Sequence, residues 1–373
     1  MFENNIYDKF GIRPLINAGG WKTACGGTKM SEVVVQAMAE ASKYFVDIEQ
    51  LNYNIGKYIA KITHAEAGMV TSGAASGVVL SIAACMTGCN KGKIRRLPST
   101  NGMKSELIIQ KMHRIAYSQM YAFSGAKLVE IGSITSCLKE ELEEAINEST
   151  AAVAYIFGPR ILQNGLKLSE VVEIAHKRNV PVIVDAAAML PPKINLHRFI
   201  EEGADLVTFS GGKIIKGPQA TGILCGKKEL INAALLNSSP QHAIGRPHKV
   251  SKEDIVGLYV ALRAYVESDE QQMFARFYKI LNLIIEGIGD IKGIQLKIIH
   301  DNVLYNVPVA VITAENEWKG PRGEEVVRLM RQGTPSVFML YLKDFDHLVI
   351  NPVSIEEAEV QSLIGRLREV LLL

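Results

Sequence analysis

The chain has 373 residues, of which 48% are hydrophobic and 21% are charged. This composition supplies the material for a packed core and excludes global disorder. Lysine and arginine number 41 against 39 aspartates and glutamates, a formal net charge of +2. The near-neutral charge argues against a protein that mainly coats nucleic acid or an anionic membrane. At about 150 residues per domain, the length suggests two domains.

The cysteines and the N-terminal sequence favour a cytoplasmic setting. Cysteine occurs at positions 25, 85, 89, 137 and 225, too few for a disulfide framework and odd in number. Cys85 and Cys89 lie in an apolar stretch without a further ligand nearby, so they indicate one face of a buried helix, and we expect no metal. The N-terminus shows no signal-peptide pattern, and we expect a cytoplasmic protein.

The stretch from Ala67 to Asn90 carries no charged residue and is long enough to cross a bilayer. Threonine, serine and glycine interrupt it. We therefore interpret it as a buried strand, a glycine-rich turn and a buried helix, and we expect no membrane contact.

After an N-terminal arm, residues 1–50, a repeating pattern of apolar runs and helical segments predicts a large α/β domain over residues 51–245. The runs are rich in valine, isoleucine, leucine and phenylalanine without strict alternation, as is typical of strands buried on both faces of a parallel sheet. The seven predicted strands are Gly68–Thr71, Glu106–Gln110, Lys127–Ile131, Ala151–Phe157, Pro181–Val184, Asp205–Phe209 and Gly222–Cys225.

Amphipathic helices separate these strands. Ser136 is placed to cap a helix over 138–147, and Ser169 to cap a helix that runs to about Lys177. Between Phe209 and Gly222 there is no room for a crossover helix, because a parallel return needs a dozen or more residues. The seventh strand is therefore predicted to be antiparallel to its neighbour in a mostly parallel, seven-stranded sheet.

Residues 246–373 predict a linker helix and a small α+β domain. A helix starts at Ser251-x-x-Asp254, a second covers about 270–287, and a hairpin joins 337–342 to 347–350. A closing helix is expected to begin at the capping box Ser354-x-x-Glu357.

Three chemical features follow predicted strands at their carboxyl ends, where α/β folds place ligands. The first is the turn Ser72-Gly73-Ala74, where a helix begins among small residues and its free N–H groups can bind a phosphate. The turn matches neither a P-loop nor a Rossmann fingerprint. Small residues here would equally serve close packing.

The other two features are Asp185, after the strand 181–184, and Lys213, in a glycine-rich turn after the strand 205–209. Each has an ordinary alternative, a turn-capping aspartate and a solvated lysine. Their separation equals one helix and one strand, which places them on adjacent strand ends. Together with the phosphate-binding helix start they fit pyridoxal 5′-phosphate (PLP), with Lys213 as its Schiff base and Asp185 on the pyridine nitrogen. Ser210 can add a hydroxyl to the phosphate.

These residues resemble a known family, the fold-type-I PLP enzymes related to selenocysteine synthase and to D-glucosaminate-6-phosphate ammonia-lyase. The resemblance covers about residues 8–265 and is carried by the segments 16–18, 113, 125–132, 184–185, 210–222 and 244–249. It implies catalytic roles for Lys213 and Asp185, with His113 stacked over the cofactor ring and Ala187 in the cofactor site. It also implies a homodimer or higher homo-oligomer. His113 independently follows the strand 106–110 at its carboxyl end, although a surface loop is its alternative.

Four residues are candidates for substrate binding. Arg160 follows the strand 151–157, and Arg246 stands in the rigid turn Gly-Arg-Pro; arginine binds carboxylates through two parallel hydrogen bonds. Asn17 and Thr23 lie in the N-terminal loop. The segment 333–339 lacks the arginine that selenocysteine synthases carry there, which puts the family's carboxylate clamp in doubt. The basic loop 91–96 has no interleaved aromatics and indicates a solvated surface, so nucleic acid binding is not expected.

The sequence therefore predicts a PLP-dependent lyase that eliminates the β-hydroxyl of a small amino acid or amino sugar acid and releases a 2-oxo acid and ammonia. One alternative is a selenocysteine synthase-like transferase acting on seryl-tRNA, against which the near-neutral charge argues. Another is a racemase or aminotransferase on the same fold. A non-enzymatic binding protein would have no need of Lys213 and Asp185.

Overall fold

The computed structural model describes residues 5–158, 164–301 and 305–373. The chain divides into two compact units. The central unit comprises residues 30–267, and the terminal unit comprises residues 1–29 together with 268–373. The predicted domain boundaries at 50 and 245 stay predictions. Within the described residues, no helix combines the length and the apolar character needed to cross a membrane.

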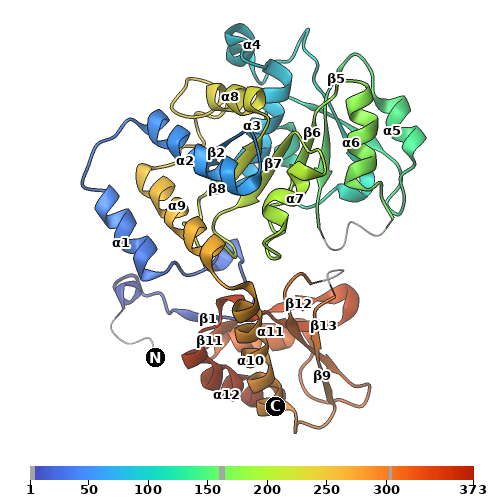
Figure 1. Cartoon of the computed structure of the whole chain (residues 1–373). Coiled ribbons are helices and arrows are strands. Elements are labelled where there is room, and N and C mark those ends of the chain that lie inside the picture. Colours follow the sequence, from blue (N-terminus) through green and yellow to red (C-terminus); the bar gives the residue numbers. More distant parts are fainter. Residues whose placement is uncertain (1–4, 159–163, 302–304) are drawn as a thin grey trace. The chain divides into compact units, whose positions relative to one another are not determined.

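The central unit is built on the predicted seven-stranded sheet (Figure 1). Its strands are β2 (Ala67–Thr71), β3 (Glu106–Gln110), β4 (Lys127–Ile131), β5 (Thr150–Ile156), β6 (Val182–Asp185), β7 (Leu206–Ser210) and β8 (Gly222–Gly226). The order across the sheet is β2-β8-β7-β6-β5-β3-β4. β3 to β7 pair in parallel, whereas β8 runs antiparallel to both β7 and β2. Both the strands and the direction of β8 are confirmed.

Helices flank this sheet and complete an α/β unit (Figure 1). They are α1 (Glu32–Ala41), α2 (Ile48–Thr63), α3 (Gly73–Thr87), α4 (Lys91–Arg96), α5 (Lys139–Ala145), α6 (Leu168–Lys177), α7 (Asn195–Glu201), α8 (Lys228–Asn237) and α9 (Lys252–Glu267). α3 is buried along nearly its whole length, as the uncharged sequence 67–90 predicts, and contacts five strands of the sheet. Apolar side chains from α3, α8 and the strands form the core of the unit.

Within the described residues, the terminal unit contains a four-stranded antiparallel sheet, a separate pair of parallel strands and three α-helices. Its strands are β1 (Leu15–Asn17), β9 (Ile294–Ile299), β10 (Val309–Ala314), β11 (Ser336–Phe338), β12 (Leu340–Leu342) and β13 (His347–Ile350), and its helices are α10 (Glu270–Ile288), α11 (Gly323–Gln332) and α12 (Val360–Leu371). The four-stranded sheet has the order β12-β13-β10-β9, and β1 pairs in parallel with β11. The first 29 residues of the N-terminal arm therefore contribute a strand to the terminal unit.

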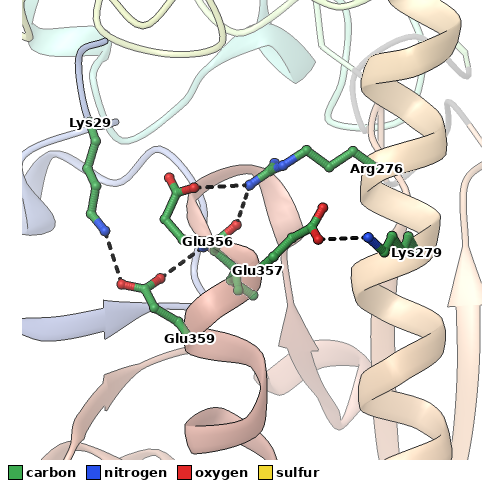
Figure 2. A network of polar contacts seen from close by, with 7 residues as sticks. Lys29, Arg276, Lys279, Glu356, Glu357 and Glu359 are labelled. Carbon is green, nitrogen blue, oxygen red and sulfur yellow. Dashed lines mark hydrogen bonds and ion pairs between the residues drawn. The ribbon is translucent and has the colours of Figure 1, made fainter. Parts of the chain in front are cut away.

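Ion pairs hold the start of α12 to the rest of the terminal unit (Figure 2). The buried carboxylate of Glu359 accepts from Lys29 Nζ at 3.0 Å and from the backbone N–H of Glu356 at 2.9 Å. On the α10 side, Lys279 Nζ lies 2.7 Å from a Glu357 carboxylate oxygen, and Arg276 donates to the Ile355 carbonyl at 2.6 Å. Through these contacts, Lys29 of the N-terminal arm and two residues of α10 bind the segment 355–359 that precedes α12.

Three predicted helix caps are wrong, although the helices themselves are present. α5 begins at Lys139, α6 at Leu168 and α12 at Val360, and the serines at 136, 169 and 354 are not their caps. A glutamate in the first turn of α5 and of α6, and at the N-cap of α12, reaches back to the backbone N–H three residues earlier, at 2.8–2.9 Å. These glutamates satisfy the free N–H groups of the first turn and set where the helix begins. By contrast, Ser251 caps α9 as predicted, accepting from the N–H of Asp254.

Candidate active site

The sheet order places the predicted cofactor residues on neighbouring strand ends of the central unit. Asp185 is the last residue of β6 and Ser210 the last of β7, and the register pairs Asp185 with Thr208. On the next strand, Gly222 lies opposite both Ser210 and Thr71, the last residue of β2, two residues before α3 begins. The carboxylate, the hydroxyl and the helix start therefore share one edge of the sheet.

Asp185 is a buried carboxylate held by two donors. Its Oδ1 accepts from the N–H of Ala187 at 3.1 Å, and its Oδ2 accepts from the Tyr121 hydroxyl at 3.0 Å. Burial raises the pKa of Asp185, against the lowering effect of both donors and of the positive charge of Lys213. Since a carboxylate offers about four acceptor positions, it can still accept a charged N–H group.

Lys213 is half-buried and lies in a turn that folds back on itself. The N–H of Gly211 donates to the Thr221 carbonyl at 2.9 Å, and the N–H of Gly217 donates to the Gly211 carbonyl at 2.9 Å. A side chain at position 212 would meet the backbone of Gln219 at 2.5 Å, so this close approach requires glycine. The turn thereby fixes the lysine backbone near the end of β7, within electrostatic range of Asp185.

The start of α3 has the properties of an anion site. Ser72 occupies the N-cap without a capping bond from its side chain, and Gly73 has φ +78° with open space where a side chain would project. Gly222 packs against this turn so closely that a Cβ would lie 2.5 Å from the Gly73 carbonyl carbon. The Thr208 hydroxyl donates to the Ala74 carbonyl at 3.4 Å. The free N–H groups and the positive end of the helix dipole are suited to a phosphate.

His113 ends the 3-10 segment η3 (Lys111–His113), directly after β3, and is fully buried. Its Nδ1 accepts from the N–H of Ile156 at 3.3 Å, and its ring packs edge-on against the Tyr155 ring, with 4.7 Å between the two ring centroids. Burial lowers the pKa of His113 to about 4, so the ring is neutral at pH 7 with its proton on Nε2. Among the described residues that Nε2 has no hydrogen-bond partner. A buried donor without a partner points to a missing ligand.

His113 lies one strand from Asp185, because Ile156 is the register partner of Asp185 between β5 and β6. The structure therefore brings His113 to the same edge as the carboxylate. Its stacking on a cofactor ring stays a prediction.

The substrate candidates fall in different parts of the chain. Arg246 is exposed in a turn whose His248 ring lies 3.1 Å from the Ser76 hydroxyl of α3. Asn17 and Thr23 belong to the terminal unit. The Asn17 side chain donates to the Gly20 carbonyl at 2.7 Å and accepts from the N–H of Gly19 at 3.0 Å, which stabilises its own turn. Arg160 lies outside the described residues. The roles of all four stay predictions.

Sequence reasoning missed Tyr121, the second donor to Asp185. It lies in the 3-10 segment η4 (Ser118–Ala122) and is 1% exposed. Burial and the neighbouring carboxylate raise its pKa well above the ordinary value. A buried tyrosine needs a partner for its hydroxyl, but no pattern in residues 118–122 ties it to a residue 64 positions away.

Comparison with known proteins places the chain in a family. The family described as "SelA: L-seryl-tRNA selenium transferase" matches residues 21–293. The chain belongs to this family. A D-glucosaminate-6-phosphate ammonia lyase of Salmonella typhimurium (strain 14028s / SGSC 2262) is 30% identical, with 98% of each chain covered. A 5′-C-glycyluridine monooxygenase-decarboxylase of a Streptomyces species is 31% identical, with 98% of this chain and 92% of the relative covered.

Solved structures agree on the architecture of this family member. A D-glucosaminate-6-phosphate ammonia-lyase matches with a TM-score of 0.86 at 28% identity, covering 99% of this chain and 98% of the other. The fold is type I of the PLP-dependent enzymes, shared with solved structures at 13–15% identity whose likeness shows the fold alone. The predicted fold class is confirmed.

The residues of this SelA family member fit PLP group by group. The start of α3 suits the phosphate, Asp185 suits a protonated pyridine nitrogen, and Lys213 supplies the amine that the aldehyde requires. The Nε2 of His113, which has no hydrogen-bond partner within the part of the chain that the structure describes, supplies a further donor at the same edge.

Proposed function

We propose that the chain is a PLP-dependent lyase of the ammonia-lyase type. The observation that carries the proposal is the convergence of Lys213, Asp185 and the open start of α3 at one edge of the sheet. The ammonia lyase of Salmonella, which aligns over 98% of both chains, supports the reaction type.

Each of these groups has a separate task. The N–H groups at the start of α3, with the Ser210 hydroxyl beside them, bind the phosphate. PLP, when bound, accepts the electron pair left at the α-carbon of the substrate. Asp185, oriented by Tyr121 and Ala187, keeps a proton on the pyridine nitrogen. The buried surroundings of Asp185 exclude water, which strengthens this charge interaction.

Lys213 is the residue we assign to proton transfer. Its Nζ amine, when not bonded to the cofactor, would take the α-proton of the substrate as a general base. The β-hydroxyl then leaves with a proton as water, and the resulting enamine takes up one water to give a 2-oxo acid and ammonia. Atoms balance, because the water lost in the elimination equals the water consumed in the hydrolysis.

For the substrate we propose an amino sugar acid with its amine on C2 and a hydroxyl on C3. Such a compound is a β-hydroxy amino acid, the class that this elimination requires. Its carboxylate needs a cation, and Arg246 of the central unit is our candidate, in the turn joined to α3 through His248. Arg246→Lys should raise KM with little effect on kcat, because lysine keeps the charge but loses the paired hydrogen bonds.

The products decide between the candidate reactions. The PLP-loaded chain is incubated with 2-amino-2-deoxyaldonic acids, with and without a terminal phosphate, and ammonia and 2-oxo acid are measured. We expect the wild type to release ammonia and 2-oxo acid in equal amounts, and Lys213→Ala to release neither. Oxygen uptake with carbon dioxide release would instead favour chemistry like that named for the Streptomyces relative. An inverted amino acid or transfer of the amine to an acceptor would favour a racemase or an aminotransferase. Selenium transfer to seryl-tRNA would favour the synthase.

We also propose that the chain forms a homodimer through the connection between α1 and α2. Tyr44, Phe45 and Val46 are exposed in this connection, with Phe45 fully so, and Tyr53 is exposed on α2. Monomeric proteins seldom leave such a patch uncovered. In analytical ultracentrifugation we expect the wild type to sediment at twice the monomer mass and Phe45→Asp to sediment at the monomer mass. A wild type that sediments as a monomer would contradict the proposal.

A further inference from the structure

Two histidines and a glutamate meet where α2 and α7 of the central unit pack against each other. His64 is the C-cap residue of α2, with φ +53°, while His197 and Glu201 stand one turn apart on α7. His64 is more than 130 positions from the other two residues in the sequence, and the fold brings one ligand atom of each within 4.8 Å of the others.

Both imidazoles are directed at the same carboxylate oxygen. His64 Nδ1 lies 2.7 Å and His197 Nδ1 lies 2.9 Å from Glu201 Oε1, and the two rings are stacked at 4.3 Å. His64 and Glu201 are about half exposed, and His197 is partly buried. An ion in solution can therefore reach the cluster.

One contact is poorly suited to a shared proton. His197 Nδ1 is shielded from solvent and, despite its short distance to Glu201, makes no hydrogen bond of acceptable geometry among the described residues. A proton must lie near the line that joins nitrogen and oxygen. A metal ion has no such requirement. With bonds of about 2.1 Å to His197 Nδ1 and to Glu201 Oε1, it would lie to one side of the line between these atoms, because they are only 2.9 Å apart.

We propose that His64, His197 and Glu201 form a divalent-metal site, with Zn²⁺ as the preferred ion. Two neutral imidazoles and one carboxylate are a donor set that zinc accepts in tetrahedral geometry, with the fourth position left to water. The separations of 2.7 and 2.9 Å need only a small expansion to reach the spacing of ligands around one ion.

The site lies away from the candidate active site. α2 ends just before β2, and α7 ends just before β7, so the cluster is near the amino ends of these two strands. Asp185 and Ser210 stand at the carboxyl ends of β6 and β7. The metal would therefore join α2 to α7 and stabilise the fold, and the inference does not depend on the proposed lyase activity.

The test uses the PLP-loaded full chain, free of any histidine tag and treated with a chelator before dialysis. Zinc chloride is titrated calorimetrically into the wild type and into His64→Gln, His197→Gln and Glu201→Gln. Exposed His242 outside the cluster provides a matched control, His242→Gln. We expect one Zn²⁺ per wild-type chain, the same affinity in the control, and affinity weaker by at least about tenfold in each ligand variant.

Two further readouts separate this site from adventitious binding. Saturating zinc should raise the melting temperature of the wild type by about 5 °C, and this shift should be absent in the ligand variants. Zinc K-edge absorption should show scattering from two imidazoles. Wild-type affinity in all three ligand variants would overturn the proposal, as would zinc binding without histidine scattering.

Discussion

The contact between Tyr121 and Asp185 makes a quantitative prediction. The Tyr121 hydroxyl donates to the buried carboxylate at 3.0 Å, and a hydrogen bond to a charged group contributes about 1.5–3 kcal/mol. Tyr121→Phe removes this donor and raises the pKa of Asp185 further, because Tyr121 is one of the groups that lower it. We expect the free energy of unfolding at pH 8 to fall by about that amount. PLP should bind about 10- to 100-fold more weakly.

The matched control is Tyr155→Phe. Tyr155 is also buried in the central unit, but its hydroxyl donates at 3.2 Å to the neutral Leu166 carbonyl. This variant should lose only about 0.5–1.5 kcal/mol of stability and keep its PLP affinity. Urea unfolding without PLP and a spectroscopic PLP titration measure both quantities. Equal PLP affinities in the two variants would refute the reasoning that Tyr121 positions Asp185 for the cofactor.

Three further predictions follow from the same edge of the sheet. Gly222→Ala should displace the turn at Gly73, because the new Cβ would lie only 2.5 Å from the Gly73 carbonyl carbon. We expect PLP to bind about tenfold or more weakly while the circular dichroism spectrum stays unchanged. Unchanged PLP affinity would contradict this. His113 has its pKa lowered to about 4, so the wild type should lose about 3 kcal/mol of stability relative to His113→Gln as the pH falls from 6.5 to 4; equal pH profiles would contradict it. Burial raises the pKa of Asp185, so the folded chain binds more protons than the unfolded chain. Without PLP, the stability of the wild type relative to Asp185→Asn should therefore decline as the pH rises through the raised pKa, and a rise in urea titrations would be the contrary result.

The sheet could be predicted because its strands are short apolar runs buried on both faces. The direction of β8 followed from the length of chain between Phe209 and Gly222 alone, which the antiparallel register confirms. Helix starts were harder, since a serine near the start of a helix need not occupy the N-cap, and a glutamate at the third helical position can bind the N-cap N–H of another residue. In α5 and α6 the N-caps are Leu138 and Lys167, whose N–H groups donate to Glu141 and Glu170, and not the predicted serines.

The candidate site was predictable only where its residues follow strands. Asp185 and Lys213 were found because strand ends in an α/β fold share one edge. Tyr121 lies in a 3-10 segment, and His64 meets His197 through helix packing, so neither contact has a local pattern. The pairing of β1 with β11 joins residues more than 300 positions apart, and no local sequence signal specifies such a partner.

The most direct test of the central claim is to locate the lysine that binds PLP. The purified chain is incubated with PLP, reduced with borohydride and digested, and the pyridoxyl group is mapped by peptide mass spectrometry. Lys216, three residues further along the same turn, provides the control variant Lys216→Ala. The account predicts the pyridoxyl group on Lys213 in the wild type and the control, and none at this turn in Lys213→Ala. A label on another lysine, or no label in the wild type, would contradict it.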